Sequence, residues 1–275
     1  MIIVKIKGGL GNQLFCYAYA KSLSLNGEHV KIDNYTFFNK TKLHGGYHLN
    51  KFKITLESAT LKEIKLIRGS NRFTKAIKVL NKTYISENDL KFDQKFLELR
   101  GNLYVEGYFQ SEKYFNNYRD IIINEFKFPN SDSIKKQRDF IKDKFCSIHV
   151  RRGDFTSKTN SEIHGILDLS YYYKAIKLIK EKGIKNFIIF SDDIDWCKNN
   201  FYDFGSKIQY SDFGLNEIDD LNLMSKCSSN IIANSTYSWW GAWLNKNKEK
   251  IVIAPKMWLK SKPYINIAAQ NWILL

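Results

Sequence analysis

The chain has 275 residues, of which 44% are hydrophobic and 15% are aromatic. These proportions exclude an intrinsically disordered protein, and the length allows one large domain or two of medium size. The formal net charge of +15, from 43 basic and 28 acidic residues, favours an anionic partner, although most lysines are scattered and are expected to cover a solvated surface.

The first half of the chain begins with the pattern of a β-α-β unit. A short apolar run is followed by a glycine-rich break and then by apolar residues at helical spacing, which end before Gly27. The segment 34–100 carries short periodic stretches in a Lys- and Asn-rich background, so we expect loops and short helices there. The predicted strands are 2–6, 29–33 and 102–109, and the predicted helices are 12–26 and 114–125.

The second half alternates strands and helices more regularly, after a turn-rich segment at 129–133 that marks the predicted domain boundary. Such alternation is typical of a parallel sheet with helices on both faces. We therefore predict an α/β protein of two Rossmann-like domains, residues 1–130 and 131–275, that face a central cleft, with ligands bound where strands end. The predicted strands are 145–150, 186–191, 207–210, 230–233 and 251–254, and the predicted helices are 171–182, 194–201, 217–225 and 237–244.

A basic motif, His-Val-Arg-Arg-Gly-Asp at residues 149–154, follows a predicted strand. In an extended segment, His149 and Arg151 point to one side and Arg152 points to the other. A guanidinium can bind phosphate oxygens in bidentate fashion and stabilise the charge that develops on a departing diphosphate. Alternatively, an arginine pairs with Asp154 or another acid and braces the loop. We expect one arginine in each role.

A glycine-rich loop lies between the first predicted strand and the first predicted helix. It lacks the third glycine of the dinucleotide-binding fingerprint, where Leu14 stands, and the sequence contains no P-loop motif. The backbone of Gly9 and Gly11 at a helix start suits an anion or sugar hydroxyls. Asn12 and Gln13 add amide donors and acceptors. The alternative is a plain tight turn in which Asn12 caps the helix.

A third motif joins a predicted strand to an aromatic helix. Asn234, Ser235 and Thr236 lie at the start of this helix, where their side chains can cap it and the backbone amides can hold a phosphate. Trp239 and Trp243 are four residues apart and therefore share one helix face, so we expect them to pack in the core.

An acidic segment, Ser191, Asp192, Asp193 and Asp195, also follows a strand. A carboxylate at this position can accept hydrogen bonds from a ribose hydroxyl or from a guanine N–H edge. Aspartates are also favoured at a helix N-terminus by the helix dipole, and clustered acids can bind a metal. Because the sequence shows no second acidic cluster to complete a metal site, we expect no required metal.

The cysteines at 16, 146, 197 and 227 lack the spacing of a zinc site or a redox pair, which favours free thiols in a reducing compartment. The apolar N-terminal run is too short for a secretory signal, and no window approaches 18 uncharged apolar residues. We therefore expect a cytoplasmic protein. Its basic charge is compatible with peripheral contact with the anionic inner face of a membrane.

Taken together, these motifs resemble those of bacterial α-1,2-fucosyltransferases, glycosyltransferase family 11. The resemblance spans nearly the whole chain and rests on blocks in the family's order. They are Gly-Gly-Leu-Gly-Asn-Gln at 8–13, Gly-Tyr-Phe-Gln-Ser at 107–111, His-Val-Arg-Arg-Gly-Asp at 149–154, Phe-Ser-Asp-Asp at 190–193, Asn-Ser-Thr-Tyr-Ser-Trp-Trp-Gly-Ala-Trp-Leu at 234–244 and Ile-Ala-Pro-Lys at 253–256.

The resemblance implies a GT-B fold, in which the first domain lies on the acceptor side and the second binds the GDP-sugar. The implied reaction transfers L-fucose from GDP-L-fucose, with inversion, to the 2-hydroxyl of galactose. The implied acceptor is a galactose-terminated oligosaccharide or lipid-linked glycan of an O-antigen or capsule. Neither a metal, a further cofactor nor a nucleic-acid partner is implied.

The resemblance also suggests roles for individual residues. An arginine of the basic motif holds the donor diphosphate, and we favour Arg152. Some relatives carry a glutamate base where this chain has Gln13, so the base is open, with His149 and Asp154 as candidates. The expected catalytic residues are Arg152, Asn12, His149 and Asp154, and the expected donor-binding residues are Gly9, Gly11, Gln13, Arg151, Ser191, Asp192, Asn234, Ser235 and Thr236.

Two alternatives accompany this hypothesis. One is a transferase of the same fold that uses another GDP- or UDP-sugar. The other is a non-catalytic protein that binds glycans or nucleic acid through a basic, aromatic surface. The position of the arginines at a strand end, rather than along an open face, favours an enzyme.

Overall fold

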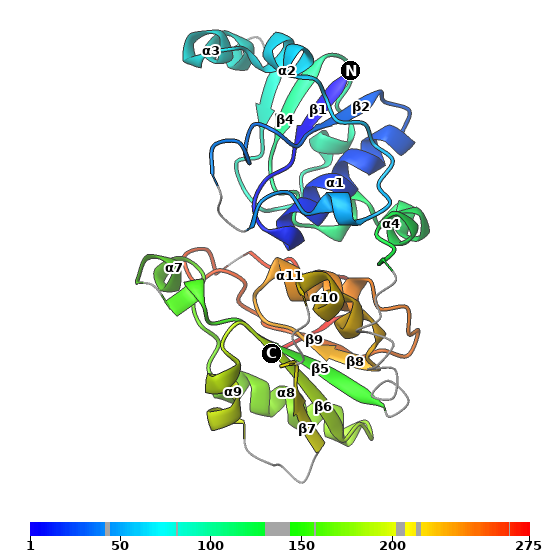
Figure 1. Cartoon of the computed structure of the whole chain (residues 1–275), viewed down its shortest axis with the longest axis vertical. Coiled ribbons are helices and arrows are strands. Elements are labelled where there is room, and N and C mark those ends of the chain that lie inside the picture. The colour runs from blue at the N-terminus through cyan, green and yellow to red at the C-terminus, as the bar shows by residue number, and fades with distance from the viewer. Residues whose placement is uncertain are drawn as a thin grey trace. The chain divides into compact units, whose positions relative to one another are not determined.

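The computed structural model describes residues 1–41, 45–80, 82–129, 144–156, 158–201, 207–212, 216–263 and 265–275. The chain divides into two compact units, 1–127 and 128–275, so the division lies close to the predicted boundary after residue 130. Each unit contains its own parallel β-sheet with helices packed against it (Figure 1).

The sheet of the first unit has the strand order β2-β1-β4-β3, and all neighbouring strands are parallel. Its strands are β1 (Ile2–Lys5), β2 (Val30–Asp33), β3 (Tyr84–Ser86) and β4 (Leu103–Glu106). The helices are α1 (Leu10–Leu25), α2 (Leu61–Arg68), α3 (Arg72–Leu80) and α4 (Arg119–Glu125). Short 3-10 turns occur at Leu49–Lys51, Gln94–Leu97, Glu112–Tyr114 and Asn116–Tyr118.

Most elements of the first unit lie close to their predicted positions. Helix α1 begins at Leu10, two residues earlier than predicted, because Gly9 is its N-cap residue. Gly27, with φ 95°, follows the helix in the left-handed region that glycine tolerates best. Strand β3 is not among the predicted strands, since its three residues are too few to show the alternation of a half-buried strand.

The sheet of the second unit has the order β10-β9-β8-β5-β6-β7, again with parallel neighbours. Its strands are β5 (Phe145–Val150), β6 (Asn186–Ser191), β7 (Lys207–Tyr210), β8 (Ser229–Ile231), β9 (Val252–Ala254) and β10 (Ile273–Leu274). The helices are α7 (Lys158–Ile163), α8 (Leu169–Glu181), α9 (Ile194–Asn200), α10 (Glu217–Lys226) and α11 (Thr236–Trp243), with a 3-10 turn at Asp154–Thr156.

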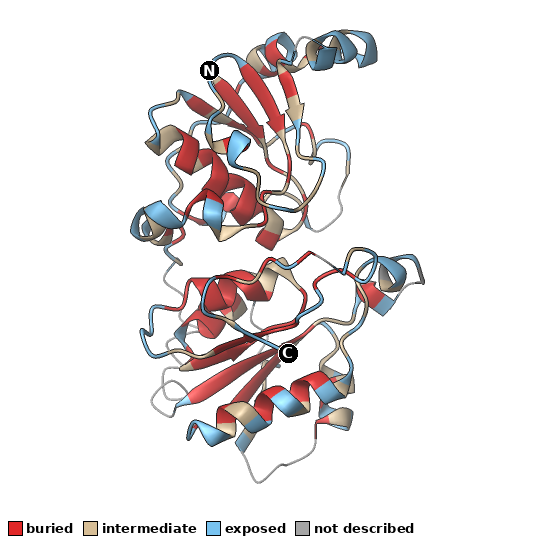
Figure 2. Cartoon of the chain, turned by 180° about the vertical axis from the view of Figure 1, so that it is seen from behind, coloured by how far each residue is buried: buried red, intermediate tan, exposed pale blue. Residues whose placement is uncertain are grey.

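Both faces of this second sheet are buried, which explains why strand β5 is buried along its whole length (Figure 2). Ile148 and its neighbours on one face pack with Tyr172 and Ile176 of α8. Phe145 on the other face packs with Met224 of α10 and lies in the cluster that Tyr237 of α11 covers. The predicted doubly covered parallel sheet is therefore confirmed.

The predicted thiols and core tryptophans are confirmed as well. Cys16, Cys146, Cys197 and Cys227 are buried and free. Trp239 and Trp243 are buried and stack with an interplanar angle of 15°. No helix among the described residues is long and apolar enough to cross a membrane.

Candidate functional site

Two of the predicted motifs meet at the middle of the second unit's sheet. From β5 the chain proceeds outward through β6 and β7, and β8 then starts on the other side of β5 and leads to β9 and β10. The topological switch point therefore lies between β5 and β8, which is where ligands of doubly wound sheets bind. The basic motif follows β5, and the segment Asn234–Thr236 follows β8.

The Asp192 carboxylate connects the end of β6 to the basic loop. Its Oδ2 accepts from Arg151 Nη1 at 2.8 Å, and its Oδ1 accepts from the backbone N–H of Arg152 at 2.9 Å. The Arg151 side chain is 31% exposed, so this ion pair leaves part of its guanidinium accessible to a ligand. Both carboxylate oxygens of Asp192 thus hold the basic loop, and its predicted ribose contact stays a prediction.

Arg152 has the bracing role. Its Nε donates to Asp193 Oδ2 at 3.0 Å, and its guanidinium carbon lies 3.9 Å from the ring centroid of Trp196. Asp193 in turn caps α9 by accepting from the backbone N–H of Trp196. A carboxylate and an indole thus hold this guanidinium, and the Arg152 side chain is 20% exposed against 31% for Arg151, so the geometry favours Arg151 over the predicted Arg152 as the phosphate ligand.

Arg151 lies on the side of the sheet that faces α11. Its charge acts on His149, whose ring lies 5.6 Å from that of Tyr237 in the first turn of α11. The Arg152 guanidinium instead lies over Trp196, which packs against the cluster of Ile148 and Tyr172 on the opposite face. The side-to-side alternation predicted for the basic motif is thus confirmed.

The N-terminus of α11 is open. Its N-cap residue, Ser235, has an extended backbone, makes no side-chain capping hydrogen bond within the described chain, and is followed by no acidic residue in the first turn. Asn234 does not cap the helix, because its Nδ2 donates to the carbonyl oxygens of His164 at 2.9 Å and Gly165 at 3.2 Å. The predicted side-chain cap is therefore wrong, and the first-turn amides, including that of Thr236, remain as anion donors.

His149 is 5% exposed, and its Nδ1 has no hydrogen-bond partner among the described residues. Burial, together with the positive charge of Arg151, lowers the pKa of His149 to about 3. The imidazole is therefore neutral at physiological pH and a very weak base, which argues against its predicted role as a proton acceptor. Asp154 belongs to a 3-10 turn, but its side chain lies outside the described part of the structure.

Gly153 is a site residue that the sequence did not single out. A Cβ atom at this position would lie 2.4 Å from Asp192 Oδ2, so no larger residue fits without moving that carboxylate. The absence of a side chain allows Asp192 to reach both Arg151 and the Arg152 amide. In the sequence, Gly153 directly follows Arg151 and Arg152, and this position could have identified it as a site residue.

A second switch point lies in the first unit, between β1 and β4. Asn12 Oδ1 accepts from Gln110 Nε2 at 2.8 Å, so the first turn of α1 is joined to the loop after β4. The Asn12 side chain lies over Gly8, whose φ of 78° and lack of a Cβ permit the close approach. Asn12 lies inside α1 rather than at its N-cap, which corrects the capping alternative, and Gly11 is buried in the same helix.

Gln13 is fully buried and fully used by the fold. Its Nε2 donates to the carbonyl oxygens of Gly8 at 2.9 Å and Gly46 at 2.8 Å, and its Oε1 accepts from the His48 amide at 2.9 Å. The predicted contact of the Gln13 side chain with the donor is therefore wrong. A glutamate base at this position would lose these donated hydrogen bonds.

Glu87 follows β3 and is missing from the predicted site because that strand is missing from the predicted sheet. Its Oε2 accepts from the amides of Tyr108 at 2.7 Å and Phe109 at 3.0 Å, while Oε1 is buried without a partner among the described residues. Burial raises the pKa of this carboxyl. Phe109 has a φ of 51°, so Glu87 holds a strained turn that presents Gln110 to Asn12.

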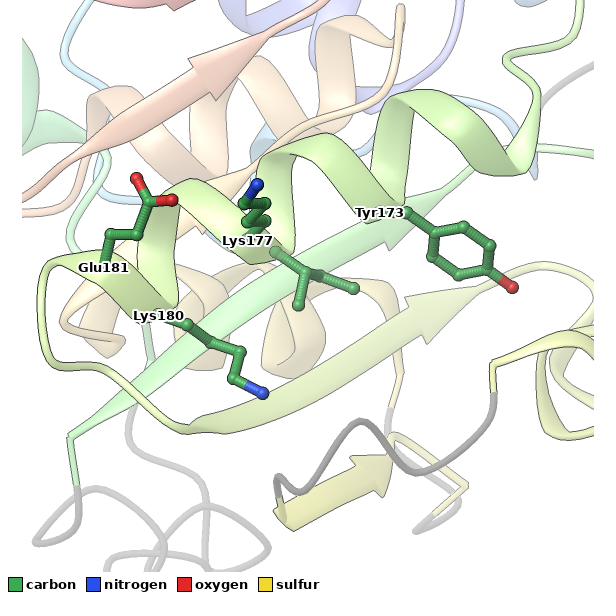
Figure 3. Close-up of a pocket in the computed structure, with 5 residues that line it drawn as sticks. Tyr173, Lys177, Lys180 and Glu181 are labelled. Carbon is green, nitrogen blue, oxygen red and sulfur yellow. The ribbon is translucent and has the colours of Figure 1, made fainter.

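Ser191, a predicted donor-binding residue, takes part in the turn that follows β6. Its Oγ accepts from the Asp193 amide at 3.0 Å. Within the described ranges, no three His, Cys, Asp or Glu side chains gather as metal ligands. A hollow of 460 Å³ lies along α8 and is lined by residues of that helix alone (Figure 3). The lining residues are Tyr173, Ile176, Lys177, Lys180 and Glu181.

Two parallel Rossmann-like sheets, with a basic loop and an open helix N-terminus at the switch point of the second, are the features expected of a GT-B glycosyltransferase. The chain belongs to glycosyl transferase family 11, whose family model matches residues 1–275. It is 34% identical to the O-antigen biosynthesis glycosyltransferase WbnK of Escherichia coli, over 98% of this chain and 99% of that protein. It is 33% identical to an alpha-1,2-colitosyltransferase of Escherichia coli, over 94% and 93% of the two chains.

Solved structures confirm the GT-B fold class. The chain resembles the NodZ alpha-1,6-fucosyltransferase soaked with GDP-fucose, with a TM-score of 0.50 and 13% identity over 88% of this chain and 91% of that one. It also resembles a mutant of Arabidopsis thaliana FUT1 in complex with GDP, with a TM-score of 0.54 and 11% identity over 92% and 70% of the two chains.

Proposed function

We propose that this family 11 enzyme transfers L-fucose from GDP-L-fucose to the 2-hydroxyl of a galactoside, in α-1,2 linkage. The acceptor that we propose is a galactose-terminated glycan of a bacterial surface polysaccharide. Membership of the family and the similarity to an O-antigen glycosyltransferase support this proposal. Two structural neighbours, a fucosyltransferase soaked with GDP-fucose and a GDP complex, are consistent with a guanine nucleotide donor.

The observation that carries the proposal is the position of Arg151 and of the open α11 N-terminus at the ends of the neighbouring strands β5 and β8, at the switch point. Both are donors that favour a phosphate, and they come from adjacent strand ends. A helix N-terminus carries a partial positive charge, which adds to that of the guanidinium. The combination suits a diphosphate better than a neutral glycan.

The same groups would assist departure of the nucleotide. In the reaction the bond between fucose C1 and the diphosphate oxygen breaks, and a bond from the galactose 2-oxygen to C1 forms on the opposite face. Negative charge grows on the departing diphosphate, where Arg151 and the amides of Ser235 and Thr236 stabilise it. The hydroxyl proton passes to the departing diphosphate or to solvent water as the new bond forms. His149 is a poor acceptor for it, since its pKa is held at about 3.

For the first unit we propose that Asn12 contacts a sugar hydroxyl. Its Oδ1 is occupied by Gln110, and Nδ2 has no hydrogen-bond partner among the described residues. The amide is therefore oriented with its donor available. Asn12→Asp would remove that donor, and it should raise KM for a sugar substrate more than Kd for GDP.

A second candidate is transfer of colitose, which is fucose without its 3-hydroxyl. The 33% identity to an alpha-1,2-colitosyltransferase favours this alternative. Incubation with GDP-fucose or GDP-colitose and a panel of β-galactosides, with the product linkage read by NMR, separates the two. Fucosyl transfer to the galactose 2-hydroxyl supports the first proposal, and exclusive use of GDP-colitose or another donor contradicts it.

The diphosphate assignment is tested by comparing Arg151→Gln with Arg152→Gln. Removal of one charge-stabilising donor costs about 3 kcal/mol of barrier, so Arg151→Gln should lower kcat by roughly two orders of magnitude and reduce the thermal shift caused by GDP. Arg152→Gln should lower the melting temperature of the free protein more than Arg151→Gln does. Lys174→Gln, an exposed change on α8, is the matched control. Wild-type kcat and GDP shift in Arg151→Gln would refute the assignment.

A further inference from the structure

Helix α3 is amphipathic but presents its apolar side to solvent. Its least exposed residues are polar, Thr74 and Lys78, and none of its nine residues is buried. On the outward side, Phe73 is 74% exposed and Leu80 is 80% exposed. A helix that packs on a globular core normally buries its apolar side, so this orientation needs a reason.

Contacts on the polar side fix the orientation of α3 in the first unit. Lys75 Nζ lies 4.3 Å from the ring centroid of Tyr84 in β3. The carbonyl oxygen of Lys78 accepts from the Thr83 amide at 2.8 Å. At the start of the helix, the Thr74 amide donates to Asn71 Oδ1 at 2.9 Å. The Lys75 contact attaches the polar edge of α3 to β3, and every residue of the helix outside that edge is exposed (Figure 2).

The preceding helix, α2, also carries exposed apolar and basic side chains. It buries Ile64 and Ile67 against the sheet and therefore has an ordinary inward face. On its outward side, Leu66 is 73% exposed, next to the exposed side chains of Lys62 and Lys65. We refer to the outward residues of both helices as the α2–α3 surface, which comprises Lys62, Lys65, Leu66, Arg72, Phe73, Ile77, Val79 and Leu80.

Charge indicates the kind of partner. Residues 61–82 contain seven Lys or Arg residues and a single acid, Glu63. That acid is already paired with Lys31 at 2.9 Å, so it does not offset the exposed cations. Apolar side chains flanked by lysines and arginines are the signature of helices that lie in the interface of an anionic bilayer.

We propose that the α2–α3 surface docks on anionic lipid membranes, with Phe73 and Leu80 inserted at the headgroup boundary. A second copy of the chain is a poorer occupant, because a two-fold contact through this surface would oppose its own positive charges. The proposal goes beyond the proposed transfer reaction and does not depend on it. If the acceptor glycan is lipid-linked, the surface would hold the enzyme where that acceptor is concentrated.

The test is flotation of the full chain with vesicles of phosphatidylcholine alone, or with about 30% phosphatidylglycerol added. Wild-type protein should float with the anionic vesicles and stay unbound with the neutral ones. Phe73→Ser with Leu80→Ser should lower the partition coefficient roughly tenfold or more, since two inserted side chains are lost. Because both residues are largely exposed, the melting temperature should not change.

The matched control is Ile121→Ser with Met257→Ser, which removes two apolar side chains that are 41% and 45% exposed elsewhere on the chain. It should bind anionic vesicles as the wild type does. Lys62→Gln with Lys65→Gln should weaken binding in a salt-sensitive way. The proposal would be overturned if wild-type protein does not bind anionic vesicles, or if the Phe73 and Leu80 variant binds them equally well. It would also be overturned if wild-type protein binds no vesicles but forms a dimer that the Phe73 and Leu80 substitutions abolish.

Activity on a soluble β-galactoside, measured in parallel, separates this proposal from the transfer reaction. The Phe73 and Leu80 variant should retain wild-type activity there, because neither residue belongs to the proposed donor site. If wild-type protein floats with anionic vesicles but does not transfer fucose to the soluble β-galactoside, the proposed function alone is refuted. Transfer by wild-type protein that never floats would refute the membrane surface alone.

Discussion

Replacement of His149 by glutamine should change how the stability of the protein depends on pH. An unfolded chain titrates its histidines near pH 6.5, whereas burial beside Arg151 lowers the pKa of this imidazole to about 3 in the fold. Between these values the unfolded chain takes up a proton and the folded protein does not. The contribution of His149 to stability is therefore full above pH 6.5 and is lost as the pH falls toward 3. At pH 5 the loss amounts to about 2 kcal/mol.

The assay is urea unfolding of wild type and His149→Gln between pH 5 and pH 7.5. The quantity of interest is the difference between the two proteins at each pH, because other groups titrate in the same range. Burial raises the pKa of Asp220 to about 6, and that of Glu87 is also raised, so both stabilise the fold as the pH falls. These contributions are common to the two proteins and cancel in the difference.

The difference in unfolding free energy should grow in favour of wild type by about 2 kcal/mol from pH 5 to pH 7.5. Circular dichroism at each pH checks that both proteins start from the same fold. A difference that stays constant across this range would show that the imidazole titrates alike in the folded and unfolded states. That result would refute the argument from burial and from the charge of Arg151.

Three further changes test the hydrogen-bonding roles of buried or close-packed residues. Gly153→Ala places a Cβ where Asp192 Oδ2 lies 2.4 Å away, so the thermal shift caused by GDP should fall, and an unchanged shift would contradict the donor-site geometry. Gln13→Leu leaves backbone groups of two loops unpaired, so it should lower the free energy of unfolding, measured in urea, by about 3 kcal/mol. A loss below about 1 kcal/mol, on the order of one ordinary hydrogen bond, would contradict the role of Gln13 in joining these loops. Glu125→Ala leaves Lys21, whose Nζ lies 2.7 Å from the Glu125 carboxylate, without its buried partner, so the free energy of unfolding should fall by about 3 kcal/mol. Adding Lys21→Met to this variant should recover part of that loss, because the unpaired charge is then removed.

The second unit is largely predictable because its pattern is local. Strands such as β5 are buried on both faces, so they appear in the sequence as continuous apolar runs bounded by polar turns. The side-to-side alternation of His149, Arg151 and Arg152 follows from strand geometry alone, because successive side chains of any extended segment point to opposite faces. No knowledge of tertiary contacts is needed to predict it.

The identity of long-range partners cannot be predicted in the same way. Both arginines of the basic motif are equally suited to phosphate in isolation, and the contacts of Arg152 with Asp193 and Trp196 join residues about forty positions apart. Gln13 is equally suited to the donor in isolation, since its partner Gly46 lies in a segment without a regular pattern. A sequence shows which side chains can donate or accept hydrogen bonds, but tertiary packing decides which partners they bind.

The first unit is less predictable because its elements are short and some contradict simple rules. Strand β3 has three residues, and without it the role of Glu87 cannot be inferred. Helix α3 has a clear amphipathic pattern, which by itself predicts a buried apolar side. Only the tertiary contacts show that the polar edge is the one attached to the unit.

The strand order of the second unit has a consequence for how this family diversifies. Every group that we assign to the leaving diphosphate comes from the ends of two neighbouring strands, β5 and β8, tied to β6 through Asp192. The residues that we propose to bind the leaving diphosphate thus lie in one unit, and their contacts do not involve the hydroxyls of the sugar. On this proposal, substitutions elsewhere would alter which sugar is carried and which acceptor receives it, and the groups that hold the diphosphate would stay the same. The 33% identity to an alpha-1,2-colitosyltransferase is compatible with such a division of roles.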